Sequence, residues 1–141
     1  RKAAKARISA DFMIVARTDA RGVTGLEDAI RRARIYLDAG ADMIFPEALK
    51  SREEFRVFAR EVKAPLLANM TEFGQTPYLE AREFQNLGYA AVIFPMTAFR
   101  VMMKAGENAY RTLMESGTQK KILKKMQTRE ALYKLLKYDP R

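Results

Sequence analysis

The stretch DFMIVARTDA, residues 11–20, decides the fold. Its apolar part, residues 13–16, is followed at once by Arg17, Thr18 and Asp19. A short, continuous apolar run of this kind is typical of a parallel strand that is covered on both faces. We therefore predict a buried parallel strand with charged and hydroxyl-bearing side chains at its carboxyl end.

Three more segments have the same form, at residues 43–45, 66–68 and 91–94. The stretches 26–37 and 55–62 between them carry apolar residues at the i, i+3, i+4, i+7 spacing of amphipathic helices. The four strand starts recur every 23 to 30 residues, which is the length of one βα unit. The pattern predicts an α/β fold with four βα units, half the number in an eight-stranded (β/α)8 TIM-type barrel.

Residues at the helix ends give more detailed expectations. Thr24 and Glu27 resemble a capping box, Gly40 stands where a helix would stop, and Ser51 where the next would begin. After the fourth strand we predict a long helix that ends near Gly117, followed by two shorter helical stretches. The methionines at helical spacing in this region are interpreted as core. The chain is then a single partial barrel domain, residues 1–141, with βα units in 1–97 and C-terminal helices in 98–141.

Composition excludes several kinds of chemistry. Apolar residues make up 48% and charged residues 30% of the 141 residues, which is ordinary for a globular domain. The chain has no cysteine and no histidine, which excludes a disulfide framework, a Cys/His zinc site, a thiol nucleophile and an imidazole base. No apolar run is long enough for a membrane span and no signal peptide begins the sequence, so a cytoplasmic protein without membrane association is expected.

The net charge of +9 raises the question of nucleic-acid binding. Much of the excess positive charge lies in residues 1–7 and 120–125, at opposite ends of the chain, without interleaved aromatic residues for base stacking. No nucleic-acid partner is therefore expected.

Active sites of parallel α/β barrels lie at the carboxyl ends of the strands, so the residues that follow each apolar run are the candidate site. Arg17 and Asp19 follow the first strand, Glu47 the second, Asn69 and Thr71 the third, and Pro95 and then Arg100 the fourth, so two cations and a carboxylate are expected to meet at these strand ends. Arginine presents a planar fork of donors that matches a carboxylate, while Asn and Thr add neutral hydrogen bonds. We call this group of side chains at the carboxyl ends of the strands the mouth of the predicted barrel. Its donors suit a small di- or tricarboxylate substrate.

Each of these residues also has a structural interpretation. Arg17 can form an ion pair with Asp19 or Glu47, and Glu47 can act as a helix N-terminal charge. In the loop TEFGQTP, Gly74 and Pro77 can make a turn while Thr76 caps the helix that follows. The spacing alone leaves both interpretations open.

Five stretches together resemble one known family, the methylisocitrate lyases of the isocitrate lyase and phosphoenolpyruvate mutase superfamily. They are DFMIVARTDA at 11–20, AGADMIFPEA at 39–48, PLLANMTEFGQTP at 65–77, FPMTAFR at 94–100 and GTQKKILKKMQTREALY at 117–133. The TEFG and MQTR elements are the most specific. The resemblance covers nearly the whole chain and identifies the four βα units as the C-terminal half of the barrel.

The resemblance implies a Mg2+-dependent cleavage of 2-methylisocitrate to pyruvate and succinate, in the methylcitrate cycle of propionate catabolism. It also implies a homotetramer in the family. Substrate-binding roles are implied for Arg17 and Glu47 at the first two strand ends, for Asn69, Met70 and Thr71 around the carboxylate pocket, and for Arg100 and Arg129 as carboxylate partners.

The departures from the family are as informative as the matches. Its KxCGH loop, which carries the catalytic cysteine, and its metal-bound carboxylates do not occur in these 141 residues. No catalytic residue and no metal ligand is therefore assigned here. Two hypotheses follow: a part of a lyase that is inactive alone, or a noncatalytic half-barrel that binds or assembles, for instance with a separate N-terminal half. A related lyase or decarboxylase of the superfamily that acts on another small carboxylate is a further alternative.

Overall fold

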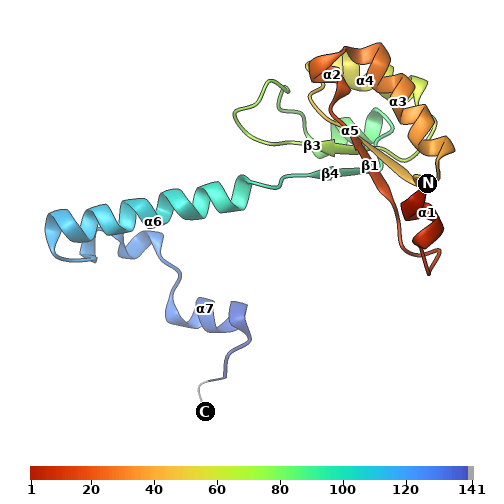
Figure 1. Ribbon diagram of the computed structural model, residues 1–141. Coiled ribbons are helices and arrows are strands. Elements are labelled where there is room, and N and C mark those ends of the chain that lie inside the picture. Colours follow the sequence, from red (N-terminus) through yellow and green to blue (C-terminus); the bar gives the residue numbers. More distant parts are fainter. Residues whose placement is uncertain (140–141) are drawn as a thin grey trace. The chain divides into compact units, whose positions relative to one another are not determined.

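The computed structural model describes residues 1–139, which fall into two compact units, residues 1–97 and 98–139. The elements of the first unit are α1 (Lys2–Ala6), β1 (Val15–Thr18), α2 (Ala20–Val23), α3 (Leu26–Asp38), β2 (Met43–Pro46), α4 (Arg52–Glu61), β3 (Leu67–Asn69), α5 (Ala81–Asn86) and β4 (Ala91–Ile93) (Figure 1). The second unit contains α6 (Thr97–Ser116) except its first residue, the 3-10 helix η1 (Lys120–Lys125) and α7 (Arg129–Leu136).

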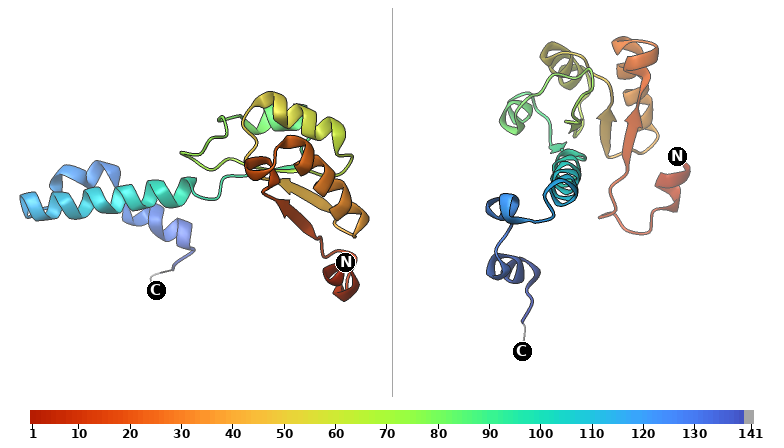
Figure 2. Two further views of the ribbon diagram at one scale, coloured as in Figure 1. Left: turned by 45° about the horizontal axis from the view of Figure 1, so that its top comes forward. Right: turned by 90° about the vertical axis from the view of Figure 1, so that its left-hand side faces the viewer.

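The four strands are parallel and lie side by side in chain order. β1 pairs with β2, β3 pairs with β4, and a single parallel bridge between Ile44 and Leu66 joins the two pairs. Each strand is followed by at least one helix (Figure 2). The predicted α/β fold is confirmed, with four successive βα units as expected for half an eight-stranded barrel.

The two faces of these strands are covered differently. Ile44, Leu66 and Ala68 are almost fully buried, in one cluster with residues of α3, α4 and α5. Because side chains alternate along a strand, the intervening residues point to the other face. There Val15 and Ile93 remain 43% and 38% exposed. The first unit therefore has one helix-covered face and one partly open face.

An aromatic cluster holds α4 and α5 together. The rings of Phe55, Phe84 and Tyr89 meet edge to face, with centroids 5.0 to 5.5 Å apart. All three side chains are buried, and burial raises the pKa of the Tyr89 hydroxyl. Edge-to-face packing adds to the free energy of simple burial, so this cluster is a main source of stability for the first unit.

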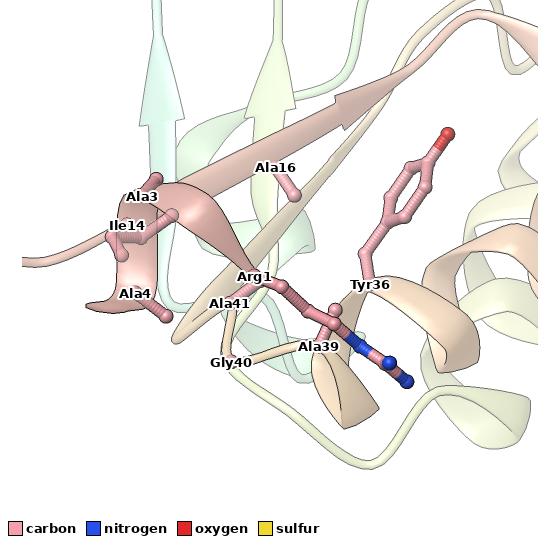
Figure 3. Close-up of a pocket in the computed structure, with 9 residues that line it drawn as sticks. All are labelled: Arg1, Ala3, Ala4, Ile14, Ala16, Tyr36, Ala39, Gly40 and Ala41. Atoms are coloured by element: carbon pink, nitrogen blue, oxygen red, sulfur yellow. The ribbon is translucent and has the colours of Figure 1, made fainter. Parts of the chain in front are cut away.

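Gly40 lies at the amino ends of the strands, opposite the end that carries the predicted site. Its φ of +103° ends α3 as predicted, and a Cβ at this position would lie 2.7 Å from the Cβ of Ala4 in α1. A small cavity of about 140 Å³ lies here, lined largely by alanines with Ile14 and Tyr36 (Figure 3). Arg7 fixes α1 nearby through an ion pair of 2.7 Å with Asp42.

The finer sequence predictions were correct in part. Ser51 caps α4, where its hydroxyl accepts from the backbone N–H of Glu54 at 3.1 Å. The capping box at Thr24 was wrong, because Gly25 occupies the N-cap position and the Thr24 hydroxyl instead lies within hydrogen-bond distance of two acceptors, Ala20 O and Asp28 Oδ2. β1 begins two residues later than predicted, at Val15.

The interpretation of the C-terminal methionines as core was also wrong. The long helix α6 ends at Ser116, as the sequence predicts, but none of its residues is buried. Met102, Met103 and Met114 are 63%, 58% and 88% exposed. Helical spacing identifies an apolar face but not whether anything covers it. No helix among the residues described is long and apolar enough to cross a membrane.

Replacing Phe55 with alanine is expected to lower the free energy of unfolding by about 3–5 kcal/mol, because it leaves a cavity between two rings. The matched control is Phe73→Ala, since Phe73 is 83% exposed. Denaturant unfolding followed by circular dichroism measures both. Equal effects of the two substitutions would contradict the assignment of the aromatic cluster as core.

Glu54 provides a test of stability against pH. Hydrogen bonds from Arg21, at 2.6 and 2.8 Å, hold the pKa of this carboxyl below its usual range. Its contribution is therefore fully present above the unfolded pKa of about 4.3 and is lost as pH falls through the lower folded value. We expect Glu54→Gln to cost about 1–3 kcal/mol at neutral pH, and the difference from the wild type to shrink in acid.

The control for this experiment is Glu53→Gln, because the side chain of Glu53 is 61% exposed in its pair with Arg56. Its effect on the unfolding midpoint should be much smaller at neutral pH. A Glu54 variant whose deficit stays constant from pH 7 to pH 3 would contradict the assigned role of this ion pair.

Candidate functional site

The parallel register brings the strand-end residues of the first unit together. Arg17 is the register partner of Phe45, and the Ile44–Leu66 bridge continues the alignment into β3. Glu47 and Asn69 directly follow this row on β2 and β3. Because parallel strands all end at the same edge of a sheet, side chains far apart in sequence converge here.

Arg17 is the centre of the charged cluster at this edge. Its guanidinium donates to Asp19 at 2.8 Å from Nη2 and lies 3.4 Å from Glu47 Oε2. The same guanidinium stacks over the ring of Phe45, 5.0 Å from its centroid. The hydrogen bond from Arg17 lowers the pKa of Asp19, and the pKa of Arg17 is raised in return. The predicted ion pairing of Arg17 with Asp19 or Glu47 is therefore present, with both carboxylates as partners.

A chain of hydrogen bonds extends from this cluster to β3. The Thr71 hydroxyl donates to Asn69 Oδ1 at 2.8 Å, and the Asn69 amide donates to Glu47 Oε2 at 3.3 Å. Glu47 Oε1 accepts from the backbone N–H of Ala48. The helix-terminus interpretation of Glu47 was wrong, because α4 begins only at Arg52.

A cavity of about 140 Å³ opens beside this chain of hydrogen bonds. It is lined by residues from the ends of β2 and β3 and from the loop after β3: Glu47, Ala48, Asn69, Thr71, Gly74, Gln75 and Thr76. Its lining combines one carboxylate with amide and hydroxyl groups. Such a set orients a small polar ligand by hydrogen bonds, without supplying a positive charge of its own.

The loop after β3 is fixed by contacts that the sequence did not indicate. The Thr76 hydroxyl donates to the carbonyl of Leu49 at 2.8 Å, and the Tyr78 hydroxyl accepts from the backbone N–H of Phe73 at 2.8 Å. Thr76 was predicted to cap the next helix, but Glu80 occupies that position. The Thr76 contact instead connects the loop to the segment after Glu47.

Ala48 is a site residue that sequence reasoning missed. It lies in the cavity wall and has a φ of +62°, which is uncommon for a residue with a Cβ. Strained backbone of this kind is frequent at ligand sites. Nothing in the residue type of Ala48 signals this conformation.

The other predicted site residues lie elsewhere in the chain. Met70 is 4% exposed and belongs to the hydrophobic core, while its backbone N–H donates to Ile93. Arg100 is in the first turn of α6 and Arg129 is the first residue of α7. Both belong to the second unit, so the structure brings together Arg17, Glu47, Asn69 and Thr71 of the predicted set.

The residues present do not form a metal site. Among residues 1–139 no three Asp, Glu, His or Cys side chains are grouped closely enough to hold a metal ion. The two carboxylates of the mouth, Asp19 and Glu47, are both engaged by Arg17. The cluster of these three residues carries a net charge of −1. The neutral side chains of Asn69 and Thr71 continue its hydrogen-bond network next to Glu47.

Known proteins share this fold and sequence. The 2-methylisocitrate lyase of Aeropyrum pernix is 62% identical over 91% of this chain and 42% of its own length. That of Halalkalibacterium halodurans is 52% identical over 94% of this chain and 44% of its own. A crystal structure of 2,3-dimethylmalate lyase, a member of the PEP mutase/isocitrate lyase superfamily, matches with a TM-score of 0.79 and 35% identity, over 87% of this chain and 43% of that one.

The chain thus spans under half the length of the curated relatives it matches. The matched length of the solved lyase fits four of eight βα units, in agreement with the half-barrel topology described above. The phosphoenolpyruvate phosphomutase family matches residues 1–114, which include all four strands and most of α6. This chain belongs to the phosphoenolpyruvate phosphomutase family, and 2-methylisocitrate lyases are among its similar relatives.

Proposed function

We propose that this chain forms the substrate-binding side of a cytoplasmic carbon–carbon lyase that cleaves 2-methylisocitrate to pyruvate and succinate in propionate catabolism. The observation that carries the proposal is the connected set Arg17, Glu47, Asn69 and Thr71 at the carboxyl ends of three parallel strands. The relatives named above, at 62% and 52% identity, support this substrate.

The reaction removes a proton from the substrate hydroxyl, whose carbon becomes the carbonyl carbon of pyruvate as one carbon–carbon bond breaks. The electron pair of that bond leaves negative charge on the departing succinate fragment, which a general acid must then protonate. Preorganised donors lower the barrier most when they face the atoms on which this charge develops. Arg17 would pair with a substrate carboxylate, while Asn69 and Thr71 would hold the oxygen atoms of the ligand in one orientation.

The proposal assigns neither proton transfer nor metal binding to this chain. It has no cysteine or histidine, and the residues described do not fit a magnesium site. Both carboxylates at the mouth are engaged by Arg17 in the structure. A base and any Mg2+ ligands would have to come from a second polypeptide segment, as the resemblance to methylisocitrate lyases implies.

A second candidate is a related lyase that acts on another small carboxylate. The match to 2,3-dimethylmalate lyase at 35% identity favours it, because the same fold in that protein accepts a dicarboxylate of different branching. Assays of the two substrates side by side separate the candidates.

Mixing this chain with the part of the Aeropyrum pernix enzyme that precedes its matched segment tests the main proposal. We expect release of pyruvate from 2-methylisocitrate in the presence of Mg2+, and a loss of at least about 100-fold in that rate with Arg17→Ala, because a charge-assisted pair to the substrate is removed. Arg31→Ala is the matched control, since Arg31 lies on α3 with its side chain 62% exposed. An assembled hybrid that is equally active with either variant would refute the assigned role of Arg17.

Binding of succinate to the 141-residue chain alone tests the charge balance of the mouth. Asp19 already accepts hydrogen bonds from the guanidinium of Arg17, so it competes with any ligand carboxylate for these N–H donors. We therefore expect Asp19→Asn to strengthen succinate binding by about five- to tenfold, and Arg17→Ala to weaken it. Isothermal titration calorimetry measures both, with Asp28→Asn on α3 as the control. Weaker binding by the Asp19 variant would show that Asp19 supports the ligand instead of competing with it.

A further inference from the structure

The stretch between β2 and α4, residues 47–51, is held in place although it forms no helix or strand. The backbone N–H of Glu47 donates to the carbonyl of Thr18 at 2.9 Å. The carbonyl of Leu49 accepts from the Thr76 hydroxyl at 2.8 Å, and the Leu49 side chain is 1% exposed in the core. This stretch, which we call the β2–α4 segment, therefore fixes the backbone that carries the Glu47 carboxylate at the mouth.

Ala48 is the strained residue of the β2–α4 segment. Its φ of +62° lies in the left-handed region, which residues with a Cβ avoid by a factor of about 5 to 30 in population. Its backbone N–H donates to the carboxylate of the neighbouring Glu47 at 3.1 Å, so the orientation of that carboxylate depends on the conformation of Ala48. A residue keeps a strained conformation only where its surroundings impose it. A contact near Ala48 must therefore hold it.

An ion pair between α2 and α4 provides such a contact. The two helices lie side by side (Figure 1), and the guanidinium of Arg21 makes two hydrogen bonds to the carboxylate of Glu54, at 2.6 and 2.8 Å. Both side chains are 19% exposed. Glu54 Oε2 also accepts from the backbone N–H of Lys50 at 2.8 Å, two residues after Ala48. One carboxylate thus connects α2, which follows β1, with the backbone of the β2–α4 segment.

Gly22 places the backbone of α2 next to the strained residue. A Cβ at Gly22 would lie 3.5 Å from the Cβ of Ala48, which is ordinary van der Waals contact. The preceding residue, Arg21, is the partner of Glu54. Loosening of the ion pair would therefore release Ala48 in two ways at once, through α2 and through the bond from Glu54 to Lys50.

We propose that Arg21 and Glu54 are positioning residues of the mouth: their ion pair imposes the left-handed backbone of Ala48 and thereby sets the orientation of the Glu47 carboxylate. Neither is among the described residues that line the cavity beside Glu47, so both act through the β2–α4 segment and not on the ligand. A purely structural ion pair would instead contribute to stability without any coupling to residue 48.

Glu47 passes the effect to the rest of the mouth. Its Oε2 lies 3.4 Å from Arg17 Nη2 and accepts from the Asn69 amide at 3.3 Å. A Glu47 carboxylate that turns away would leave Arg17 paired with Asp19 and remove an acceptor from Asn69. Ligand binding should then weaken although no residue in contact with the ligand is changed. This last step rests on the substrate-binding role proposed above, whereas the effect on Ala48 does not.

NMR couplings that report the φ angle of Ala48 test the proposal without a ligand. Glu54→Gln replaces a carboxylate oxygen with an amide nitrogen, which cannot accept from Arg21 or Lys50. We expect the left-handed form of Ala48 to fall from nearly all molecules to a minority, since the intrinsic preference for negative φ then decides. The matched control is Glu53→Gln on the same helix. An unchanged φ at Ala48 in the folded Glu54 variant would overturn the proposal.

Succinate binding to the 141-residue chain, measured by isothermal titration calorimetry, tests the consequence for the mouth. We expect Glu54→Gln to weaken binding by about five- to tenfold in the wild-type background, because Ala48 leaves its strained form. In a chain that also carries Ala48→Gly, the same substitution should weaken binding by less than about twofold, because glycine adopts positive φ about as readily as negative φ. Equal losses in the two backgrounds would show a merely structural ion pair and refute the positioning role.

The two measurements separate this proposal from the proposed function. A wild-type chain that does not bind succinate would contradict the binding role of the mouth, and the φ of Ala48 would then decide the positioning role alone. A changed φ together with unchanged binding would refute the link from Ala48 to Glu47. Circular dichroism verifies folding, and Arg21→Gln, which removes the same ion pair from α2, replaces Glu54→Gln if that variant is unfolded.

Discussion

Parallel pairing of four strands in chain order is the constraint on which the rest of the first unit depends. It places every βα loop at the same edge and determines, through the register, which residues of different loops become neighbours. Arg17 and Glu47 are thirty residues apart in sequence, yet their side chains lie 3.4 Å apart because Arg17 and Phe45 are register partners. A shift of β2 by one residue against β1 would turn the side chains of β2 to the other face of the sheet and so separate Glu47 from Arg17.

The chemistry of the mouth follows from how its charges are balanced. Arg17 is shared between Asp19 and Glu47, so it is held in place but is not free to bind an anion without competition. Asn69 and Thr71 extend the same network with neutral groups. An isolated arginine would attract carboxylates more strongly but would be less well oriented. Under the lyase function proposed above, such an arrangement would favour a defined ligand position over high affinity, as is needed to stabilise charge that appears only during a reaction.

Much of this arrangement was predictable from the sequence, because continuous apolar runs followed by polar residues identify parallel strands and their carboxyl ends. The strand order, the half-barrel topology and the proximity of Arg17, Glu47 and Asn69 all follow from that pattern. The details that failed depend on contacts between distant segments. Thr76 bonds to Leu49 instead of a helix end, and Ala48 takes a left-handed backbone that its residue type does not favour. Local patterns carry no information on such contacts.

The exposed apolar residues of the chain require a different explanation from its buried ones. The apolar spacing of α6 and the continuous apolar run that forms β1 are both patterns typical of buried elements, yet Met102 and Val15 remain 63% and 43% exposed. Burial of apolar side chains contributes about 25 cal/mol for each Å² removed from water, so surfaces of this kind are a reservoir of association free energy.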